Sequence, residues 1–209
     1  MNKPKYSLFG IHRSGTNYLT QLLLKNFNAG KRQGYWKHSL DLPENWNQDE
    51  PSFLIYKNPV TWTESIIRKK VDWNKTQTRY PATEEHENPD LMVKGNNIEN
   101  LIRTWVDFHD TWFFSDVMKG DNRHIIRYED LLEDELRNQH LDRTAEITGW
   151  DPIVSEWENI EAGGVPESRF FKEEKKEVYA KGKAEILTPD QVNFIKDYVG
   201  RDKLLQMRY

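Results

Sequence analysis

Hydrophobic and polar residues alternate along the chain in a way that predicts strands and helices in turn. Residues 5–10, 52–56 and 124–128 are short β-prone runs, each bounded by polar or turn-forming residues. Between them lie longer segments in which apolar residues recur at helical spacing. Strands that alternate with helices predict an α/β fold with a central, mostly parallel sheet flanked by helices.

Apolar spacing places a helix after the first run, with one face buried: Tyr18, Leu19, Leu22, Leu23 and Phe27. Further helices are predicted over residues 61–71, 98–118 and 130–148. The last helix begins at Thr188, because a threonine cap, Pro189 and Gln191 form a typical helix start.

Two polar segments, residues 72–97 and 158–187, lack a clear period. Irregular stretches of this length in a compact domain are usually functional loops. We expect one domain over residues 1–209. Trp62, Trp105 and Trp112 fall at helical spacing and are predicted core residues, whereas Trp36 and Trp73 lie in or beside irregular segments and could line an acceptor pocket.

The composition of the chain excludes several kinds of site and classes of partner. The chain has no cysteine, which excludes disulfides, thiolate metal sites and cysteine nucleophiles. Thirty basic and thirty-four acidic residues give a net charge of -4, which argues against a nucleic-acid or membrane partner. The mean hydropathy is -0.89, no apolar run is long enough to span a membrane, and the first residues do not form a signal peptide. These features predict a cytoplasmic protein.

The segment that follows the first predicted strand has the composition of an anion-binding loop. Gly10 and Gly15 frame a turn between a strand and a helix start, where free backbone N–H groups and the helix dipole attract an anion. Arg13 adds a positive charge, and Ser14, Thr16 and Asn17 add side-chain donors. The generic nucleotide loop has a lysine at the position that Thr16 occupies here. Phosphate binding is therefore favoured over a plain connection, but ATP is disfavoured.

The run Arg-Ser-Gly-Thr-Asn-Tyr-Leu, residues 13–19, resembles the 5′-phosphosulfate-binding loop of the sulfotransferases. Two later blocks are similar to motifs of the same family and occur in the same order. Lys57-Asn58-Pro59 with Ser65 resembles its 3′-phosphate motif, and Tyr-Glu-Asp-Leu-Leu, residues 128–132, resembles the block after a later core strand. Together they span most of the first two thirds of the chain.

This resemblance implies a P-loop-like, three-layer fold and transfer of a sulfuryl group from 3′-phosphoadenosine 5′-phosphosulfate to an acceptor hydroxyl, without a metal. It implies that Arg13 contacts the 5′-phosphosulfate, that the loop supplies donors, and that Lys57 and Ser65 hold the 3′-phosphate. Tyr18 and Tyr128 would lie against the adenine. The residues with donor-binding roles are Arg13, Ser14, Gly15, Thr16, Asn17, Tyr18, Lys57, Ser65 and Tyr128.

Two positions depart from the family pattern. Lys57 replaces an arginine, which keeps the charge but loses the bidentate fork. The family's C-terminal Arg-Lys-Gly block has no close counterpart; Lys181, in Lys181-Gly182-Lys183, is one candidate and Arg169 is another.

Sulfuryl transfer to a hydroxyl needs a base, and histidine suits that role near neutral pH. His38 lies between the loop and Lys57, where the family usually has its catalytic histidine, and Lys37 beside it could stabilise charge on the sulfuryl oxygens. The alternative for His38 is a partly exposed loop histidine. His12 could line the cleft or only pack, and His109 is predicted to pack in a helix.

Two other functions remain open at this stage. A kinase or NTPase that uses ATP and Mg²⁺ fits the two glycines but not the missing lysine. A nucleotide-binding regulatory protein would keep the pocket without catalysis. The expected acceptor is a small molecule or a carbohydrate; neither it nor an oligomeric state is indicated by a motif.

Overall fold

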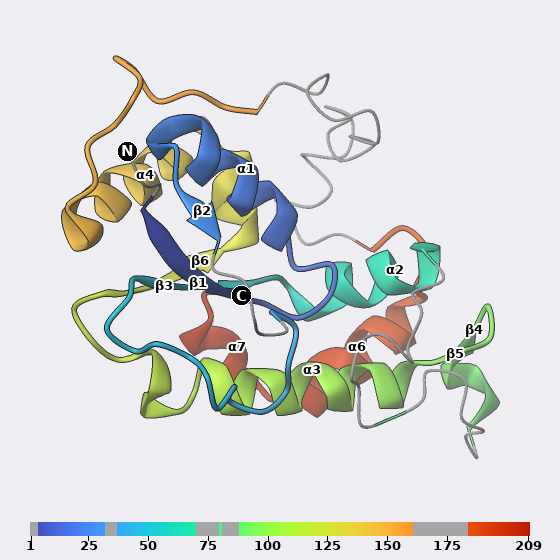
Figure 1. The fold of residues 1–209 in the computed structure, drawn as a ribbon. Coiled ribbons are helices and arrows are strands. Elements are labelled where there is room, and N and C mark those ends of the chain that lie inside the picture. The colour runs from blue at the N-terminus through green and yellow to red at the C-terminus, as the bar shows by residue number, and fades with distance from the viewer. Residues whose placement is uncertain (1–3, 32–36, 70–79, 81–87, 161–183) are drawn as a thin grey trace.

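Four short parallel strands form the centre of the fold in the computed structural model, which describes residues 4–31, 37–69, 80, 88–160 and 184–209. Hydrogen bonds order them β2-β1-β3-β6. Their bounds are β1 Lys5–Phe9, β2 Gly30–Lys31, β3 Ser52–Tyr56 and β6 Arg123–Arg127. Every pairing in this sheet is parallel. The predicted α/β class with a parallel central sheet is therefore confirmed (Figure 1).

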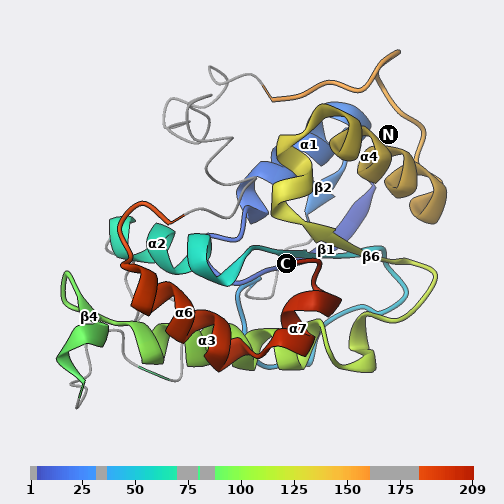
Figure 2. The same cartoon turned by 180° about the vertical axis from the view of Figure 1, so that it is seen from behind.

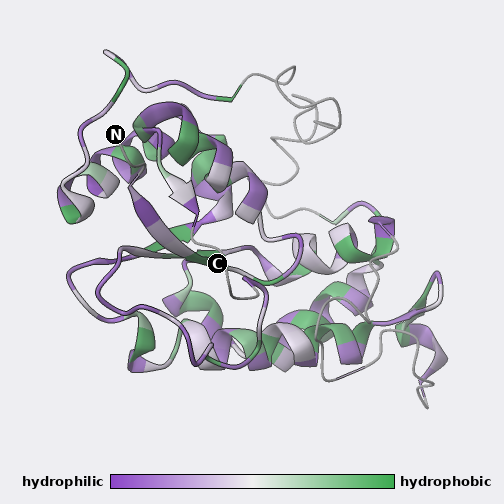
Figure 3. Cartoon of the chain, viewed as in Figure 1, coloured by the Kyte–Doolittle hydropathy of each residue, from purple (hydrophilic) through white to green (hydrophobic). Residues whose placement is uncertain are grey.

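Helices cover both faces of the sheet. Their bounds are α1 Thr16–Phe27, α2 Pro59–Lys69, α3 Ile98–Trp112, α4 Asp134–Thr148, α6 Pro189–Val199 and α7 Arg201–Gln206. Figures 1 and 2 show α1 and α4 on one side of the strands and α3, α6 and α7 on the other. Apolar and polar residues alternate around these helices (Figure 3). Among them, α1 turns a clear apolar side to the sheet, whereas the short α7 has no buried residue.

The three predicted strands occur, with ends that differ from the prediction by one residue at most. The two-residue strand β2 was not predicted, because two residues carry no readable period. The predicted helix face of α1 is confirmed: all five of its apolar residues are buried. The capping box at the start of α6 is confirmed as well, with Thr188 and Gln191 exchanging both of its hydrogen bonds.

Three helix ends differ from the prediction. Helix α2 begins at Pro59 rather than residue 61, because the Asn58 side chain accepts from two amide groups of its first turn. Helix α3 ends at Trp112 rather than 118, and a separate 3₁₀ turn, Asp116–Met118, follows. Helix α4 begins at Asp134 rather than 130, because residues 128–132 form a 3₁₀ helix whose carboxylates bond to other elements.

Part of the first irregular segment is ordered into regular structure, contrary to the prediction. A 3₁₀ turn, Pro89–Leu91, leads into a small antiparallel hairpin of β4 Met92–Val93 and β5 Asn96–Asn97. Lys94 and Gly95 both have positive φ at its turn. This is the backbone that a tight two-residue hairpin requires. Within the described ranges, no helix is both long and apolar enough to cross a bilayer.

Aromatic residues dominate the core on the α3 side of the sheet. Trp62, Trp105 and Trp112 are fully buried, as predicted from their spacing. His109 is also fully buried and stacks on Trp105 with ring centroids 3.8 Å apart. Its Nδ1 lies 2.6 Å from the Trp105 carbonyl oxygen, so this nitrogen carries the proton and donates. The predicted packing role of His109 is confirmed.

The buried imidazole of His109 makes stability depend on pH. Burial lowers the pKa of His109 to about 3, against 6.5 in the unfolded chain. Between these values the unfolded state binds more protons, so stability is lost as pH falls from 6.5. We expect His109→Phe to lose less stability on acidification, by up to about 1.4 kcal/mol per pH unit. Urea unfolding of both proteins at pH 7.5 and 5 measures this. An equal loss in both would contradict the assignment.

Candidate functional site

The loop between β1 and α1 has the backbone shape of an anion-binding nest. Arg13 has φ of 68° and Gly15 has φ of 99°, so two left-handed residues flank Ser14. Gly15 also caps α1, whose first N–H groups have no side-chain cap. Left-handed residues at such a turn direct successive amide groups into one concavity, at the positive end of the helix dipole. The backbone is therefore arranged to bind a negatively charged group.

Glycine is required at both ends of this loop. A Cβ added to Gly10 would lie 2.7 Å from Ser14 Oγ and 2.8 Å from a methyl carbon of Ile55. A Cβ on Gly15 would lie 2.3 Å from Cδ2 of Tyr128. The two glycines thus let the loop fold down onto β3 and onto the Tyr128 ring.

The hydroxyl of Ser14 is buried in the loop. Its side chain is fully shielded from solvent, and among the described residues Oγ has no hydrogen-bond partner. Buried polar atoms are nearly always paired, because an unmet hydrogen bond costs about 1–3 kcal/mol. Thr16 is buried beside it, whereas Asn17 is exposed on the first turn of α1. Ser14 therefore offers a donor that a bound anion could use.

Lys57 and Tyr128 lie at the ends of neighbouring strands. Tyr56 of β3 pairs with Arg127 of β6, so the next residue of each strand lies at the same edge of the sheet. Lys57 is only 3% exposed, and its Nζ lies 5.1 Å from the centroid of the Tyr128 ring. Burial lowers the pKa of Lys57, Glu129 opposes this, and the nearby charge of Arg13 lowers it further. Lys57 and Arg13 therefore lie close enough for their charges to act on each other, and Glu129 partly balances the lysine.

The loop and α2 are tied together by backbone contacts. The indole N–H of Trp62 donates to the carbonyl oxygen of His12 at 2.6 Å. Ser65, one turn further on, is buried and its hydroxyl donates to the carbonyl oxygen of Trp62 at 2.8 Å. The Ser65 oxygen donates within its own helix and can still accept a hydrogen bond.

Tyr18 lies in the core rather than at an open surface. It is 8% exposed, and its hydroxyl donates to the Asn159 side-chain oxygen at 2.6 Å, with the Leu131 carbonyl oxygen also 3.2 Å away. The ring is packed among residues of α1 and the 3₁₀ helix that follows β6. The adenine contact expected for Tyr18 stays a prediction, and the structure adds that the ring is largely buried.

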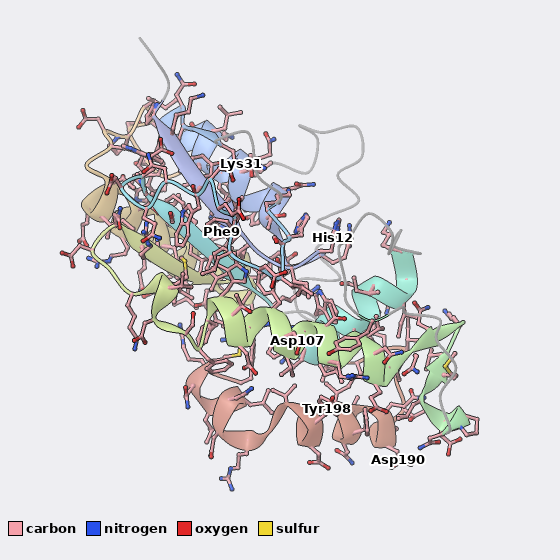
Figure 4. The ribbon with its side chains drawn as sticks, turned by 60° about the horizontal axis from the view of Figure 1, so that its bottom comes forward. Phe9, His12, Lys31, Asp107, Asp190 and Tyr198 are labelled. Carbon is pink, nitrogen blue, oxygen red and sulfur yellow. The ribbon has the colours of Figure 1, made fainter. Side chains whose placement is uncertain are left out.

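His38 is held against the loop, and its ring packs against the ring of His12. Its Nδ1 lies 2.5 Å from the Gly10 carbonyl oxygen, and the Gly10 N–H donates to the Lys37 carbonyl oxygen. The rings of His12 and His38 are 3.9 Å apart. His12 projects from the loop just beyond Phe9 at the end of β1 (Figure 4). His38 is 6% exposed, so the alternative of an exposed loop histidine is wrong.

The charges around His38 keep the pair of imidazoles neutral. Burial, His12 and Lys37 lower the pKa of His38 to about 2, and burial with Lys37 and Arg13 lowers the pKa of His12 to about 4. Lys37 donates to the Asn17 side chain at 2.5 Å. Burial and the neighbouring Lys31 lower the pKa of Lys37 to about 8. Cationic and neutral basic groups thus converge on the loop.

Sequence reasoning missed several buried acidic residues near this site. Glu64, 2% exposed, accepts from the consecutive amides of Glu185, Ile186 and Leu187. Glu129, also 2% exposed, accepts from the Asn58 N–H and from Tyr209. Their signal in the sequence is weak, because a glutamate inside a helix or beside a strand is usually exposed.

His124 and His140 form a second pair that the spacing did not predict. Nε2 of His124 lies 3.0 Å from Nδ1 of His140, whose other nitrogen lies 3.3 Å from Asp130. Packing of α4 on β6 brings these residues together, which residue spacing cannot show. Lys181, Arg169, Trp36 and Trp73 lie outside the described residues. Among the residues that are described, no three metal-ligating side chains gather at one point.

The contact between Gly15 and Tyr128 gives a direct test of the loop geometry. We expect Gly15→Ala to lower the free energy of unfolding by about 3 kcal/mol, because it adds a left-handed strain and an overlap with the Tyr128 ring. Gly149 has φ of 65° and nothing within 4 Å of an added Cβ, so Gly149→Ala is the matched control for strain alone. The control should lose about 1–2 kcal/mol. Equal losses in urea unfolding would show that the ring does not pack on Gly15.

Comparison of this chain with family models, with curated proteins and with solved structures finds no match in any of the three. The functional assignment therefore depends on the site itself.

Proposed function

We propose that the protein is a sulfotransferase that uses 3′-phosphoadenosine 5′-phosphosulfate as its donor. One observation carries the proposal: the ring of Tyr128 contacts both Gly15 and the ammonium group of Lys57. The three sequence blocks that resemble sulfotransferase motifs, separated by about 40 to 70 residues, therefore meet at one edge of the sheet.

The residues at this edge fit a donor with two phosphate positions. The nest around Ser14, with the N-terminus of α1, suits the 5′-phosphosulfate, and Arg13 adds a charge beside it. Lys57 and Ser65, at the start and in the second turn of the neighbouring segment, suit the 3′-phosphate. In this proposal Tyr128 lies between the two phosphate positions, and Tyr18 and Tyr128 are the aromatic residues on the adenine side.

The proposal includes a P-loop-like, three-layer architecture. Its support is the order of the first elements, a strand, a glycine loop and a helix, at the centre of a parallel sheet with helices on both faces. The loop lies beyond the carboxyl end of β1, next to the end of β3. Ligands of open parallel sheets usually bind at this edge.

The bound donor would supply an activated sulfuryl group, and the chain's own residues would orient it and move one proton. Nδ1 of His38 faces a carbonyl oxygen and therefore carries a proton, which makes Nε2 the basic nitrogen. His38 takes the acceptor's hydroxyl proton at this atom. A pKa of about 2 makes a weak base, but a neighbouring anion raises it, so His38 becomes effective when the donor is bound.

Arg13, Lys37 and the loop amides act electrostatically. They lie around the position where negative charge develops on the transferring group and on the departing phosphate oxygen. Lys37 is held by Asn17 at the mouth of the loop, which keeps its charge near the first turn of α1. The acceptor in this proposal is a hydroxyl of a small molecule or a carbohydrate.

Calorimetric titration with adenosine 3′,5′-bisphosphate, beside ADP with and without Mg²⁺, tests the donor assignment. We expect metal-independent binding of the bisphosphate, with ADP at least about tenfold weaker because it lacks the 3′-phosphate that Lys57 would hold. Lys57→Met should remove most of this preference while ADP binding stays nearly unchanged. Mg²⁺-dependent ADP binding with a weak bisphosphate would contradict the proposal and indicate a kinase or NTPase.

Separate substitutions of His38 and His12 test the proposed base. Transfer of ³⁵S from the labelled donor to a panel of phenol, alkyl and saccharide hydroxyls identifies an acceptor. With that acceptor, His38→Gln should lower turnover by about 10²–10⁴-fold while bisphosphate affinity changes little. His12→Gln should lower turnover by less than about tenfold. The opposite order would assign the base to His12, and bisphosphate binding without transfer to any acceptor would indicate a non-catalytic protein.

A further inference from the structure

Residues 207–209 fold back onto the strand ends beneath the proposed donor site. The Tyr56 hydroxyl donates to the Met207 carbonyl oxygen at 3.3 Å. Arg208 Nη1 donates to Oδ2 of Asp130 at 2.9 Å. The Tyr209 hydroxyl donates to Oε2 of Glu129 at 2.9 Å. Three consecutive residues thus bond to the ends of β3 and β6, far from them in sequence.

Glu129 is the buried acceptor at the centre of these contacts. While Oε2 accepts from Tyr209, Oε1 accepts from the Asn58 N–H at 2.9 Å. The Nε of Arg127 lies 3.6 Å from the same carboxylate, and the Arg127 guanidinium lies 4.6 Å from the Tyr209 ring. Asn58 follows Lys57 directly, so Glu129 bonds to the backbone that carries the lysine. Its carboxylate is fixed on several sides.

The Glu129 carboxylate favours the charged form of Lys57. A buried ammonium loses the solvation of water, and burial accordingly lowers the pKa of Lys57. The carboxylate of Glu129 is the first influence that acts in the opposite direction. Burial raises the pKa of Glu129 itself, while the N–H groups of Asn58 and Glu129, the Lys57 charge and the Tyr209 hydroxyl lower it. Each member of the pair therefore favours the charged form of the other.

We propose that Glu129 and Tyr209 are positioning residues for Lys57: Tyr209 holds the Glu129 carboxylate, and Glu129 fixes the backbone beside Lys57 through the Asn58 N–H and supplies a buried negative charge that balances the ammonium group. The identity of the phosphate rests on the proposed function, whereas the arrangement of the three side chains is independent of that function. Neither Glu129 nor Tyr209 contacts the donor, so both act through Lys57.

Other charged groups also face this pair and set the background. Arg13 of the loop and Arg68 of α2 lower the pKa of Lys57, and Glu64 of α2 raises it. Arg127 of β6 lies near Glu129. Tyr209 differs from these groups because it is not charged at neutral pH and donates a single hydrogen bond to the Glu129 carboxylate. Removing the Tyr209 hydroxyl therefore weakens one defined contact and leaves the remaining charges in place.

Removal of the Tyr209 hydroxyl should lower the pKa of Lys57. Without the Tyr209 hydroxyl the carboxylate is less well stabilised and attracts a proton more readily. Lys57 then loses part of its counter-charge, and its pKa falls further. The lysine loses its charge as pH rises through its pKa, so phosphate affinity in the variant should decline at a lower pH than in the wild type. A purely structural contact predicts a loss that does not depend on pH.

Tyr209→Phe removes one hydroxyl and keeps the ring next to Arg127. Glu129→Gln removes the charge and keeps the shape. Tyr198→Phe is the matched control, because Tyr198 lies on α6, away from His12 and the loop (Figure 4), and is 39% exposed. The first measurement is the titration of Lys57 in the unliganded protein, by NMR of labelled lysine side chains, with the signal assigned from Lys57→Arg. The second is calorimetric titration with adenosine 3′,5′-bisphosphate between pH 6 and 8.5.

We expect the Lys57 titration to move to lower pH in Tyr209→Phe and further in Glu129→Gln, with no change in Tyr198→Phe. Bisphosphate affinity of Tyr209→Phe should be within about threefold of wild type at pH 6 and about tenfold weaker at pH 8. An unchanged Lys57 titration, or a loss of affinity that is the same at both pH values, overturns the proposal. If the wild type binds no bisphosphate, the proposed function fails, and the Lys57 titration alone still decides the positioning role.

Discussion

The charge of Lys57 is buried at the ends of two parallel strands, and the proposed site depends on how that charge is held. A lysine that is 3% exposed keeps its proton only where the surroundings replace the lost water. Glu129 supplies the counter-charge, and Tyr128 supplies a ring face beside Nζ. The same ring packs against Gly15 of the glycine loop. One group of contacts thus fixes both the lysine and the loop.

The parallel sheet explains why residues so distant in sequence form one site. In parallel strands all carboxyl ends lie on one edge, so the residues that follow β1, β3 and β6 come together there. The loop, Lys57 and the 3₁₀ helix after β6 are the segments in question. Two further segments are joined to this part of the fold by buried carboxylates. Tyr209, after α7, bonds to Glu129, and the amide of Leu187, before α6, bonds to Glu64. The sheet provides the frame, and buried carboxylates join the outer segments to it.

Local signals predicted the fold well, and contacts between distant elements were not predicted. The apolar face of α1 and the Thr188 cap depend on neighbours within a turn, so their residue types were sufficient. The start of α4 was wrong because Glu129 and Asp130 bond to other elements, and the end of α3 was wrong because Ser115 caps a separate 3₁₀ turn. The contacts of the Tyr18 hydroxyl with Leu131 and Asn159 were not predicted either, because both partners lie more than a hundred residues away. Glu129 with Tyr209, and His124 with His140, required the three-dimensional structure.

The central claim is that the loop and the Lys57–Ser65 segment hold two phosphates of one nucleotide. Amide NMR spectra recorded with adenosine 5′-monophosphate and with adenosine 3′,5′-bisphosphate test it most directly, because the two ligands differ by one phosphate. The account predicts that both ligands shift the amides of residues 13–17, and that only the bisphosphate also shifts those from Lys57 to Ser65. Identical patterns for the two ligands, or shifts confined to other parts of the chain, would contradict it.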